Sequence, residues 1–353
     1  MTNILQPYID RGELAGAVTL VANAEKILSL KCIGYADIAA KIPMQPNTMF
    51  WIASQSKPIT CTALMMLVDD GKVCVDDPVE KYLPEFKSMW LSVERDDEHI
   101  LLKRPSRLIT VRDILSHTSG MGFMSALEVP TLDLQPLREC SLSYAMTPLS
   151  FEPGTKYEYA NTGINTVGRI IEVVSGMPYE EFLQTRMFKP LRMIDTTFVP
   201  NDEQMTRMTK CYQPNADRTG LEEVTISQLK YPFNDKSRKP MPAGGLFSTA
   251  TDCGHFMQMV LNDGIYEGKR YLSTESIKQM TSKQTGELAD EYGFGWASGE
   301  NYFGHGGACA TNMAAHTKEG IIIVYLIQET NGFLGDGGMA LETFVKDARE
   351  KYS

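Results

Sequence analysis

Strand patterns lie at both ends of the chain, and helical patterns fill the middle. Apolar and small residues alternate in Ala17–Val21 and Ile27–Cys32, on either side of the polar Asn23–Lys26, which predicts a β-hairpin. The β-branched run Gly320–Ile327 predicts a strand near the other end. We therefore predict an α/β (α+β) fold. One antiparallel sheet is flanked by helices and built from both termini, and a mainly helical lobe is inserted between its halves.

Two further strands are predicted near the C-terminus, at Gly293–Ala297 and Cys309–Ala315. The charged Glu94–His99 and the polar Asp235–Pro240 are interpreted as surface loops. Helices are predicted from apolar spacing and from flanking Gly and Pro at residues 1–12, Pro58–Asp70, Thr162–Val174, Pro178–Phe188, Thr251–Leu261 and Met339–Glu350.

The length of the chain predicts two lobes. Single hydrophobic cores stop growing near ~250–300 residues, and this chain has 353. We place the sheet lobe at residues 1–75 and 241–353 and the mainly helical lobe at residues 76–240, with the active site at their interface.

Composition excludes several classes of protein. The net charge of −10 argues against a nucleic-acid partner, because such proteins present basic faces. No apolar run approaches the ~18 residues of a membrane span. The seven cysteines are scattered without a C-x-x-C pair, which favours reduced core thiols over a disulfide framework or a metal site. With no signal-peptide pattern at the start, we expect a cytoplasmic protein; a leader removed before residue 1 would allow a periplasmic one.

A serine and a lysine one helical turn apart open the apolar helix predicted at Pro58–Asp70. Ser54 and Lys57 form an S-x-x-K motif, and positions three apart share one helix face. Serine needs an adjacent base to become a nucleophile. Lysine can be that base if burial lowers its pKa. A second copy, Ser227–Lys230, lies in a polar, loop-like stretch and is assigned to chance.

Two more motifs carry polar groups suited to acyl chemistry. Tyr159 and Asn161 form the one Y-x-N, just before a predicted helix. A tyrosine beside an ammonium group loses its proton more easily and can act as general acid or base, and the amide can contact both the lysine and a substrate carbonyl. The alternative is a packed tyrosine and an N-capping asparagine.

The other motif is His305-Gly306-Gly307, followed by Ala308. Small residues there let a substrate lie along a strand edge, and a backbone N–H near Ala308 could stabilise an oxyanion. The alternative is a glycine-rich hairpin turn that carries a surface histidine.

Together these motifs resemble the serine β-lactamase and penicillin-binding-protein family, and within it the class C-like branch with D-peptidases and carboxylesterases. The resemblance extends over most of the chain. Its landmarks are Phe50–Lys57, Asp113–Gly120, Tyr159–Asn161, Pro242–Thr249, Tyr292–Trp296 and His305–Gly307.

The resemblance implies a role for each matching residue. Ser54 would be the acylated nucleophile, Lys57 its activating partner and Tyr159 a proton shuttle. Asn161 would contact the substrate, and the N–H groups of Ser54 and Ala308 would form the oxyanion hole. His117 belongs to a landmark segment and is given a structural role. No counterpart of a dedicated deacylating glutamate is present, so water would be activated through Tyr159 and Lys57.

The third motif departs from the family pattern. Many β-lactamases carry Lys-Thr-Gly where this chain has His305, Gly306 and Gly307, and the lysine attracts the substrate carboxylate. A mostly neutral imidazole favours a neutral ester. We therefore expect a cofactor-free and metal-free serine hydrolase that acts on a small-molecule ester or amide, most simply a carboxylesterase on short or medium acyl esters. The alternatives are a β-lactamase, a D-amino-acid peptidase or an acyltransferase of the same fold, and a non-catalytic sensor.

The Met- and Leu-rich segment Met121–Glu139 either lines the pocket or belongs to the core, and we favour the core.

Overall fold

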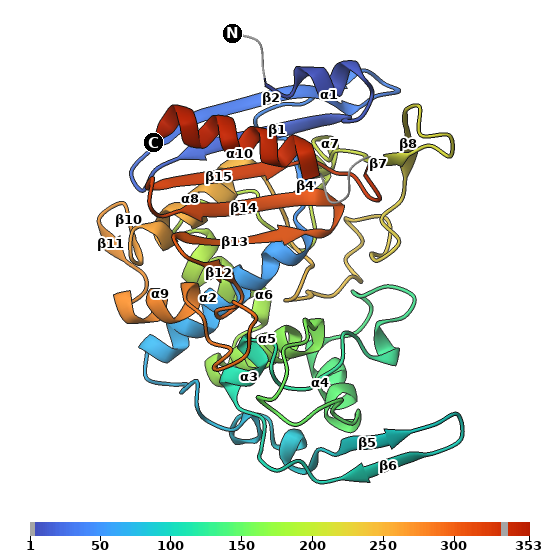
Figure 1. Cartoon of the computed structure of the whole chain (residues 1–353), viewed down its shortest axis with the longest axis vertical. Helices are drawn as coiled ribbons and strands as arrows, with labels where there is room; N and C mark the ends of the chain where they lie inside the picture. The colour runs from blue at the N-terminus through green and yellow to red at the C-terminus, as the bar shows by residue number, and fades with distance from the viewer. Residues whose placement is uncertain (1–3, 333–337) are drawn as a thin grey trace.

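A seven-stranded antiparallel sheet joins the two ends of the chain, in the order β12-β13-β14-β15-β1-β2-β3. The computed structural model describes residues 4–332 and 338–353. The N-terminal hairpin lies directly against the last strand, with Leu20 opposite Val324, which confirms a sheet built from both ends (Figure 1). The strands are β1 (Gly16–Ala22), β2 (Ile27–Asp37), β3 (Ile42–Pro43), β12 (Ala297–Gly299), β13 (Tyr302–Gly307), β14 (Thr311–His316) and β15 (Ile321–Leu326).

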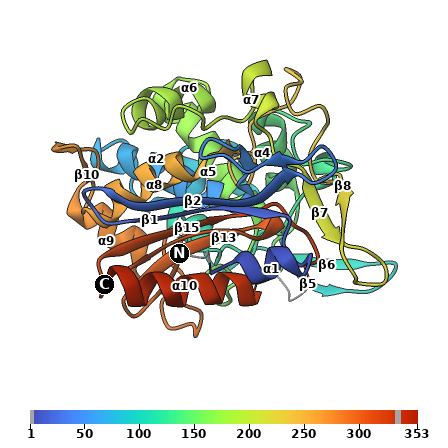
Figure 2. The same ribbon diagram turned by 90° about the horizontal axis from the view of Figure 1, so that it is seen from above.

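Helices cover both faces of this sheet (Figure 2). Alternate residues of a strand point to opposite faces. Ile323 therefore packs toward Phe344 of helix α10 (Gly338–Tyr352), while Val324 packs toward Phe256 of helix α8 (Ala250–Leu261). Such two-sided burial explains why β15 is a continuous apolar run in the sequence.

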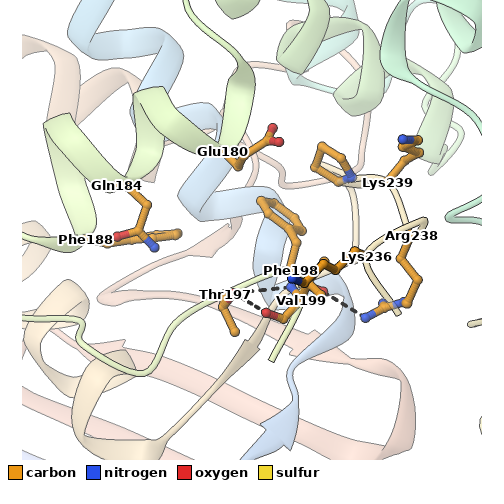
Figure 3. Close-up of a pocket in the computed structure, with 10 residues that line it drawn as sticks. Glu180, Gln184, Phe188, Thr197, Phe198, Val199, Lys236, Arg238 and Lys239 are labelled. Carbon is orange, nitrogen blue, oxygen red and sulfur yellow. Dashed lines mark hydrogen bonds between the residues drawn. The ribbon is translucent and has the colours of Figure 1, made fainter. Parts of the chain in front are cut away.

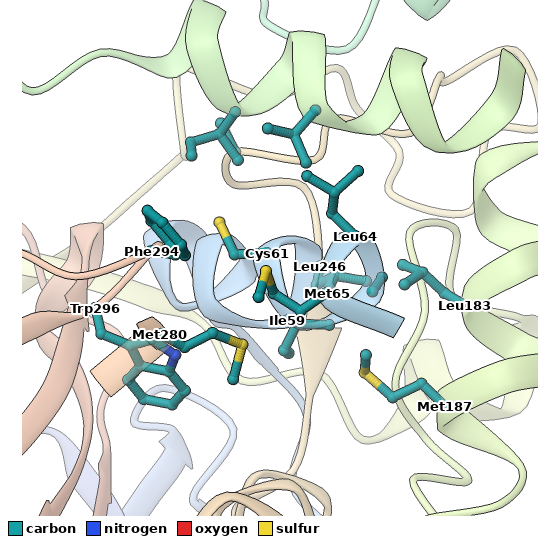
Figure 4. Packing of buried hydrophobic residues seen from close by; sticks show 14 of the residues in the cluster. Ile59, Cys61, Leu64, Met65, Leu183, Met187, Leu246, Met280, Phe294 and Trp296 are labelled. Carbon is teal, nitrogen blue, oxygen red and sulfur yellow. The ribbon is translucent and has the colours of Figure 1, made fainter. Parts of the chain in front are cut away.

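Helix α2 (Ser56–Asp69) is buried along most of its length. Figure 4 shows its side chains packed among residues from distant segments, including Leu183, Met280 and Trp296. The helix ends before Gly71, whose φ of +70° suits glycine at that position. The predicted helix at Pro58–Asp70 is confirmed, and it begins two residues after Ser54.

The other helices and short strand pairs surround α2. Helix α1 (Gln6–Asp10) lies on the α10 face of the sheet. The remaining α-helices are α3 (Val111–Leu115), α4 (Leu137–Met146), α5 (Asn161–Ser175), α6 (Tyr179–Leu183), α7 (Asp202–Thr206) and α9 (Thr274–Thr281). The short turns are η1 (Ala53–Gln55), η2 (Val79–Lys81), η3 (Pro84–Ser88), η4 (Ala126–Glu128), η6 (Ala308–Ala310) and the π-helix η5 (Gln184–Phe188). The paired short strands are β4 (Phe50–Trp51) with β9 (Phe247–Ser248), β5 (Leu91–Arg95) with β6 (Ile100–Lys103), β7 (Cys211–Pro214) with β8 (Leu221–Val224), and β10 (Ile265–Tyr266) with β11 (Lys269–Arg270).

Part of the segment assigned to the helical lobe lies against the sheet. The Lys210 N–H donates to Ala36 O, and the Tyr212 N–H donates to Gln328 O, at 2.9 Å in both cases. Residues near 210 therefore belong spatially with the sheet. The division at residues 75/76 and 240/241 stays a prediction.

Several sequence-based interpretations need correction, some of them only in part. In the segment Glu94–His99, the first two residues belong to strand β5, whereas residues 96–99 form the exposed loop of the β5–β6 hairpin, as predicted. No strand covers most of Gly293–Ala297, where the Gly293 N–H turns back to Trp296 O. Residues 304–307 belong to strand β13 and are not a hairpin turn. The predicted strand Cys309–Ala315 begins only at Thr311, because Cys309 and the next residue have positive φ and form η6.

The loop Asp235–Pro240 carries one buried charge. Arg238 Nε donates to Asp133 Oδ2 at 2.6 Å, and both side chains are almost fully enclosed. The surface interpretation is wrong for this residue, since a buried guanidinium needs such a partner. None of the helices among residues 4–332 and 338–353 combines the length and apolar composition needed to cross a bilayer.

Candidate active site

Ser54 lies in a tight turn between a short strand and the buried helix. Strand β4 ends at Trp51, η1 carries Ser54, and α2 follows directly. The turn forces Ala53 to φ +46°, a strained conformation for a residue with a Cβ. Lys57 Nζ lies 3.1 Å from Ser54 Oγ. The predicted nucleophile and base therefore face each other one turn apart, and Ser54 keeps a half-exposed side chain.

The surroundings of Lys57 favour an uncharged amine. Its side chain is fully buried, and this desolvation lowers its pKa to about 7. Besides Ser54, Nζ contacts Asn161 Oδ1 at 2.8 Å and Ala243 O at 2.7 Å. Both oxygens can only accept, so they take the two N–H bonds of a neutral amine. The remaining lone pair then faces the Ser54 hydroxyl, which is the arrangement of a general base.

Asn161 contacts the lysine and does not cap its helix. The N-cap of α5 is Ala160, and Asn161 is the first helical residue. The N-cap interpretation is therefore wrong, and the expected contact between the amide and Lys57 is present.

Tyr159 lies over the same group. Its ring centroid is 4.6 Å from Lys57 Nζ, and its side chain hydrogen-bonds Ser54. Burial raises its pKa above the ordinary value, and the bond to Ser54 offsets only part of the rise. The expectation of an easily lost proton is therefore wrong, because burial of the tyrosine itself outweighs the hydrogen bond to Ser54. Tyr159 retains its proton and can act as a donor.

The glycines of the third motif bring strand β13 against the turn that holds Ser54. A Cβ on Gly307 would approach Ile52 O to 2.4 Å, so only glycine allows this contact. Thr311 Oγ1 also donates to Ile52 O at 3.3 Å. Ala308 follows in η6, which contacts η1. Gly306 is exposed, and a Cβ there would make only ordinary van der Waals contact, with Thr311 O at 3.7 Å, so this strand edge is free of steric crowding.

His305 is buried within a relay of hydrogen bonds whose direction is fixed at both ends. Its Nδ1 lies 2.5 Å from Gly306 O, a group that only accepts, so Nδ1 carries the proton. Its Nε2 therefore accepts from the Tyr292 hydroxyl at 3.0 Å. At the other end, His117 Nδ1 accepts from the Ala160 N–H at 3.3 Å, so His117 Nε2–H donates to Tyr292 at 3.3 Å.

Both imidazoles of this relay are neutral. Burial lowers the pKa of His305 to about 3 and holds that of His117 well below its usual range. The two ring nitrogens of His305 are engaged within the protein, so its side chain positions the third motif and presents no charge to a ligand. The alternative interpretation of His305 as a surface histidine is therefore wrong. The relay joins the backbone beside Tyr159 to the backbone of Gly306.

Sequence reasoning missed two groups that complete the site, Ala243 and Tyr292, and gave a third, His117, a structural role without its partners. Ala243 supplies a carbonyl to Lys57, and its N–H is held by Asn165 Oδ1 at 2.9 Å. Tyr292 links the two histidines, and the His117 ring contacts the Tyr159 ring with 4.6 Å between centroids and a tilt of 46°. Ala243, Tyr292 and His117 all lie in landmark segments of the sequence, but their partners are distant along the chain.

Apolar side chains lie near Tyr159 at the surface. In the segment Met121–Glu139, Phe123 is 51% exposed and Met124 is 40% exposed. Phe123 O accepts from the Asn161 N–H at 3.1 Å, and its ring lies 6.5 Å from the ring of Tyr159. The preference for a core segment is therefore wrong for this part, although Met121 is buried.

Of two cavities of similar volume, only one borders a predicted site residue. One, of about 410 Å³, lies between the α6–η5 helices and residues 197–199 and 236–240, and none of the predicted site residues lines it (Figure 3). The other, of about 420 Å³, is lined by Trp51, Ala308, Cys309 and Glu329 among others. This second cavity adjoins the predicted oxyanion donor.

Comparisons with known proteins show what this chain is similar to. The Beta-lactamase family model matches residues 1–341. Protein Rv1367c of Mycobacterium tuberculosis is 31% identical, over 96% of this chain and 91% of its own length. Lovastatin esterase of Penicillium rubens is 27% identical, over 98% of this chain and 89% of its own. The solved structure of EstCE1, a hydrolase with promiscuous acyltransferase activity, superimposes with a TM-score of 0.79 at 23% identity, covering 99% of this chain and 97% of that one.

Proposed function

The chain belongs to the beta-lactamase family of serine hydrolases, and from that premise we propose that it is a carboxylesterase that forms an acyl-enzyme on Ser54. The observation that carries the proposal is the hydrogen bonding of Lys57. Nζ lies within hydrogen-bond distance of two fixed acceptors, Asn161 Oδ1 and Ala243 O, and 3.1 Å from Ser54 Oγ, so that the neutral amine directs its lone pair toward Ser54.

Acylation begins when Ser54 Oγ attacks the ester carbonyl and its proton passes to Lys57 Nζ. The carbonyl oxygen becomes an oxyanion, which accepts hydrogen bonds from the N–H groups of Ser54 and Ala308. The C–O bond to the alcohol then breaks. The alcohol oxygen takes a proton from Tyr159, which regains one from the Lys57 ammonium.

Deacylation repeats these steps with water as the nucleophile. Water occupies the place of the departed alcohol and gives its proton to the Tyr159–Lys57 pair as it attacks the acyl carbon. Ser54 Oγ leaves and takes that proton back. No dedicated glutamate is needed in this scheme, because the low pKa of Lys57 lets it accept and release a proton near neutral pH.

A neutral ester is favoured over a β-lactam by the charge of the third motif. His305 is buried and neutral, so it offers no cation to a substrate carboxylate. The exposed ring of Phe123, 6.5 Å from the ring of Tyr159, suits an apolar acyl group. The esterase named among the relatives points to the same class.

Side-by-side rates on a short-chain nitrophenyl ester and a chromogenic cephalosporin test this proposal. We expect ester turnover that disappears in Ser54→Ala, with little cephalosporin hydrolysis by either protein. Cephalosporin turnover that exceeds ester turnover would contradict the esterase proposal and favour the β-lactamase alternative.

Tyr292→Phe is expected to lower kcat and to leave KM nearly unchanged. The variant removes the hydroxyl that donates to His305 and accepts from His117. Strand β13, which carries His305, and the ring of Tyr159, which contacts His117, are then no longer held by a shared hydrogen-bonding group. Misplacement of catalytic groups by about 1 Å costs roughly 10²-fold in rate, and we expect a loss of roughly 10–100-fold. The measurement is kcat and KM on the nitrophenyl ester.

A matched control is Tyr157→Phe, because that ring lies 5.6 Å from the ring of Tyr292 but contributes no hydroxyl to the relay. It should retain the wild-type kcat. Nitrogen chemical shifts of His305 provide a second readout, since its Nε2 should lose a hydrogen bond in Tyr292→Phe alone. An unchanged kcat together with unchanged shifts would contradict the positioning role.

A further inference from the structure

Two buried cysteines from distant parts of the chain meet beside the predicted oxyanion donor. Cys211 opens strand β7, and Cys309 lies in η6 immediately after Ala308. Their Sγ atoms are 3.8 Å apart, and both side chains are buried. All seven cysteines fall within the described part of the chain, and all are free thiols there. No local pattern in the sequence distinguishes these two from the other five.

We propose that Cys211 and Cys309 form a redox-sensitive modification site, which a hydroperoxide converts to a disulfide that switches off the adjacent active site. This inference rests in part on the proposed function, because the expected loss of activity passes through Ala308.

The chemistry of the pair favours Cys309 as the attacking thiol. Either thiol can donate in the contact between the two Sγ atoms. With Cys211 as the donor, the hydrogen bond lowers the pKa of the Cys309 thiol and raises that of Cys211. A Cys309 thiolate attacks one peroxide oxygen, the O–O bond breaks, and hydroxide leaves to become water, so Cys309 becomes a sulfenic acid. Cys211, losing its proton, then attacks the sulfenic sulfur and displaces its oxygen as a second water. The two thiols are oxidised by two electrons, and the peroxide is reduced.

A small oxidant has a route to this pair. Cys309 and Ala308 both line the cavity of about 420 Å³ beside the sheet. Cys211 is not among the lining residues of that cavity and contacts Cys309. The thiol with the lowered pKa is therefore the one that borders open space, and the second thiol is placed to resolve the sulfenic acid.

Disulfide formation must move the turn that holds Ala308. A disulfide needs Sγ atoms about 2.05 Å apart, so the present separation of 3.8 Å has to shrink. Strand β7 is held by the hydrogen bond from the Tyr212 N–H to Gln328 O at 2.9 Å. The turn η6 is tied to the same segment through the Glu329 N–H, which donates to Cys309 O at 3.1 Å. It is nevertheless only three residues long and lies outside the strands, with Cys309 at φ +64°. We expect the turn to move, and with it the Ala308 N–H, whose catalytic geometry tolerates little displacement.

The test is treatment of the full chain with hydrogen peroxide, followed by removal of the peroxide with catalase. We expect peptide mapping to find a Cys211–Cys309 cross-link, with the loss of two hydrogen atoms, and ester turnover to fall at least ~10-fold. Dithiothreitol should reverse both changes. Cys211→Ser should keep its turnover after the same treatment, and Cys74→Ser, which removes an exposed thiol, should behave like the wild type.

The outcomes separate this inference from the proposed function. Peroxide that yields no cross-link, or only irreversible sulfinic acid at Cys309, would overturn the dithiol site. A cross-link without loss of turnover would overturn its link to Ala308. A cross-link in a protein that hydrolyses no ester would support the dithiol chemistry and contradict the esterase proposal instead.

Discussion

Ser54→Ala is expected to abolish ester turnover while the protein stays folded. Without the hydroxyl no acyl-enzyme can form, and loss of a nucleophile of this kind lowers kcat by roughly 10⁴-fold or more. The fold should tolerate the change, because the side chain is half-exposed and its hydroxyl contacts the other site residues Lys57 and Tyr159. The measurements are the rate on a nitrophenyl ester and the thermal unfolding midpoint.

The chain offers a matched control for this variant. Ser227 heads the second S-x-x-K and is exposed, with no buried helix behind it. Ser227→Ala should keep the wild-type rate. If Ser54→Ala retained its activity with an unchanged unfolding midpoint, the covalent mechanism would be wrong.

Lys57→Met is expected to give the second large effect, a loss of roughly 10²–10⁴-fold in kcat/KM. Methionine fills a similar volume but accepts no proton. Lys230→Met, which alters the lysine of the second motif, is the control and should remain active, since that lysine lies at the surface beside Asp235.

The same lysine sets the expected pH dependence. Desolvation lowers the pKa of Lys57 to about 7, and only the neutral amine accepts the serine proton. Activity of the wild type should therefore rise with pH, with a midpoint near 7, and then level off. A kcat/KM profile measured across neutral pH checks this. A midpoint several pH units higher would mean that Lys57 is charged in the free enzyme and would contradict its assignment as base.

Elements with strong local patterns could be predicted from the sequence. Strand β15 and helix α2 are continuous apolar runs, and helix α5 shows regular apolar spacing that ends at Gly176. Such patterns follow from burial on the same element, so each could be predicted without its neighbours. Strand β13 was missed because three of its residues are glycines, which have low strand propensity. Gly307 is required by the close approach of the backbone to Ile52, a residue far away in the sequence, so no local pattern predicts it.

Some residues of the candidate site could likewise be predicted from local spacing, and others could not. Ser54 and Lys57 could be paired from spacing alone, because one helix turn fixes their separation. The Ala243 carbonyl and the Tyr292 relay could not, since their partners are far along the chain and meet only in the folded protein. The pKa of Tyr159 was expected to fall and instead rises, because burial of the tyrosine itself outweighs the hydrogen bond to Ser54.

The most direct test of the account is to identify the covalent intermediate. The protein is mixed with a slowly hydrolysed nitrophenyl ester and quenched in acid, and its peptides are analysed by mass spectrometry. We predict an acyl group on the peptide that contains Ser54, and no acylated peptide in Ser54→Ala. Ester turnover without an adduct on Ser54, or with an adduct on another residue, would contradict the account.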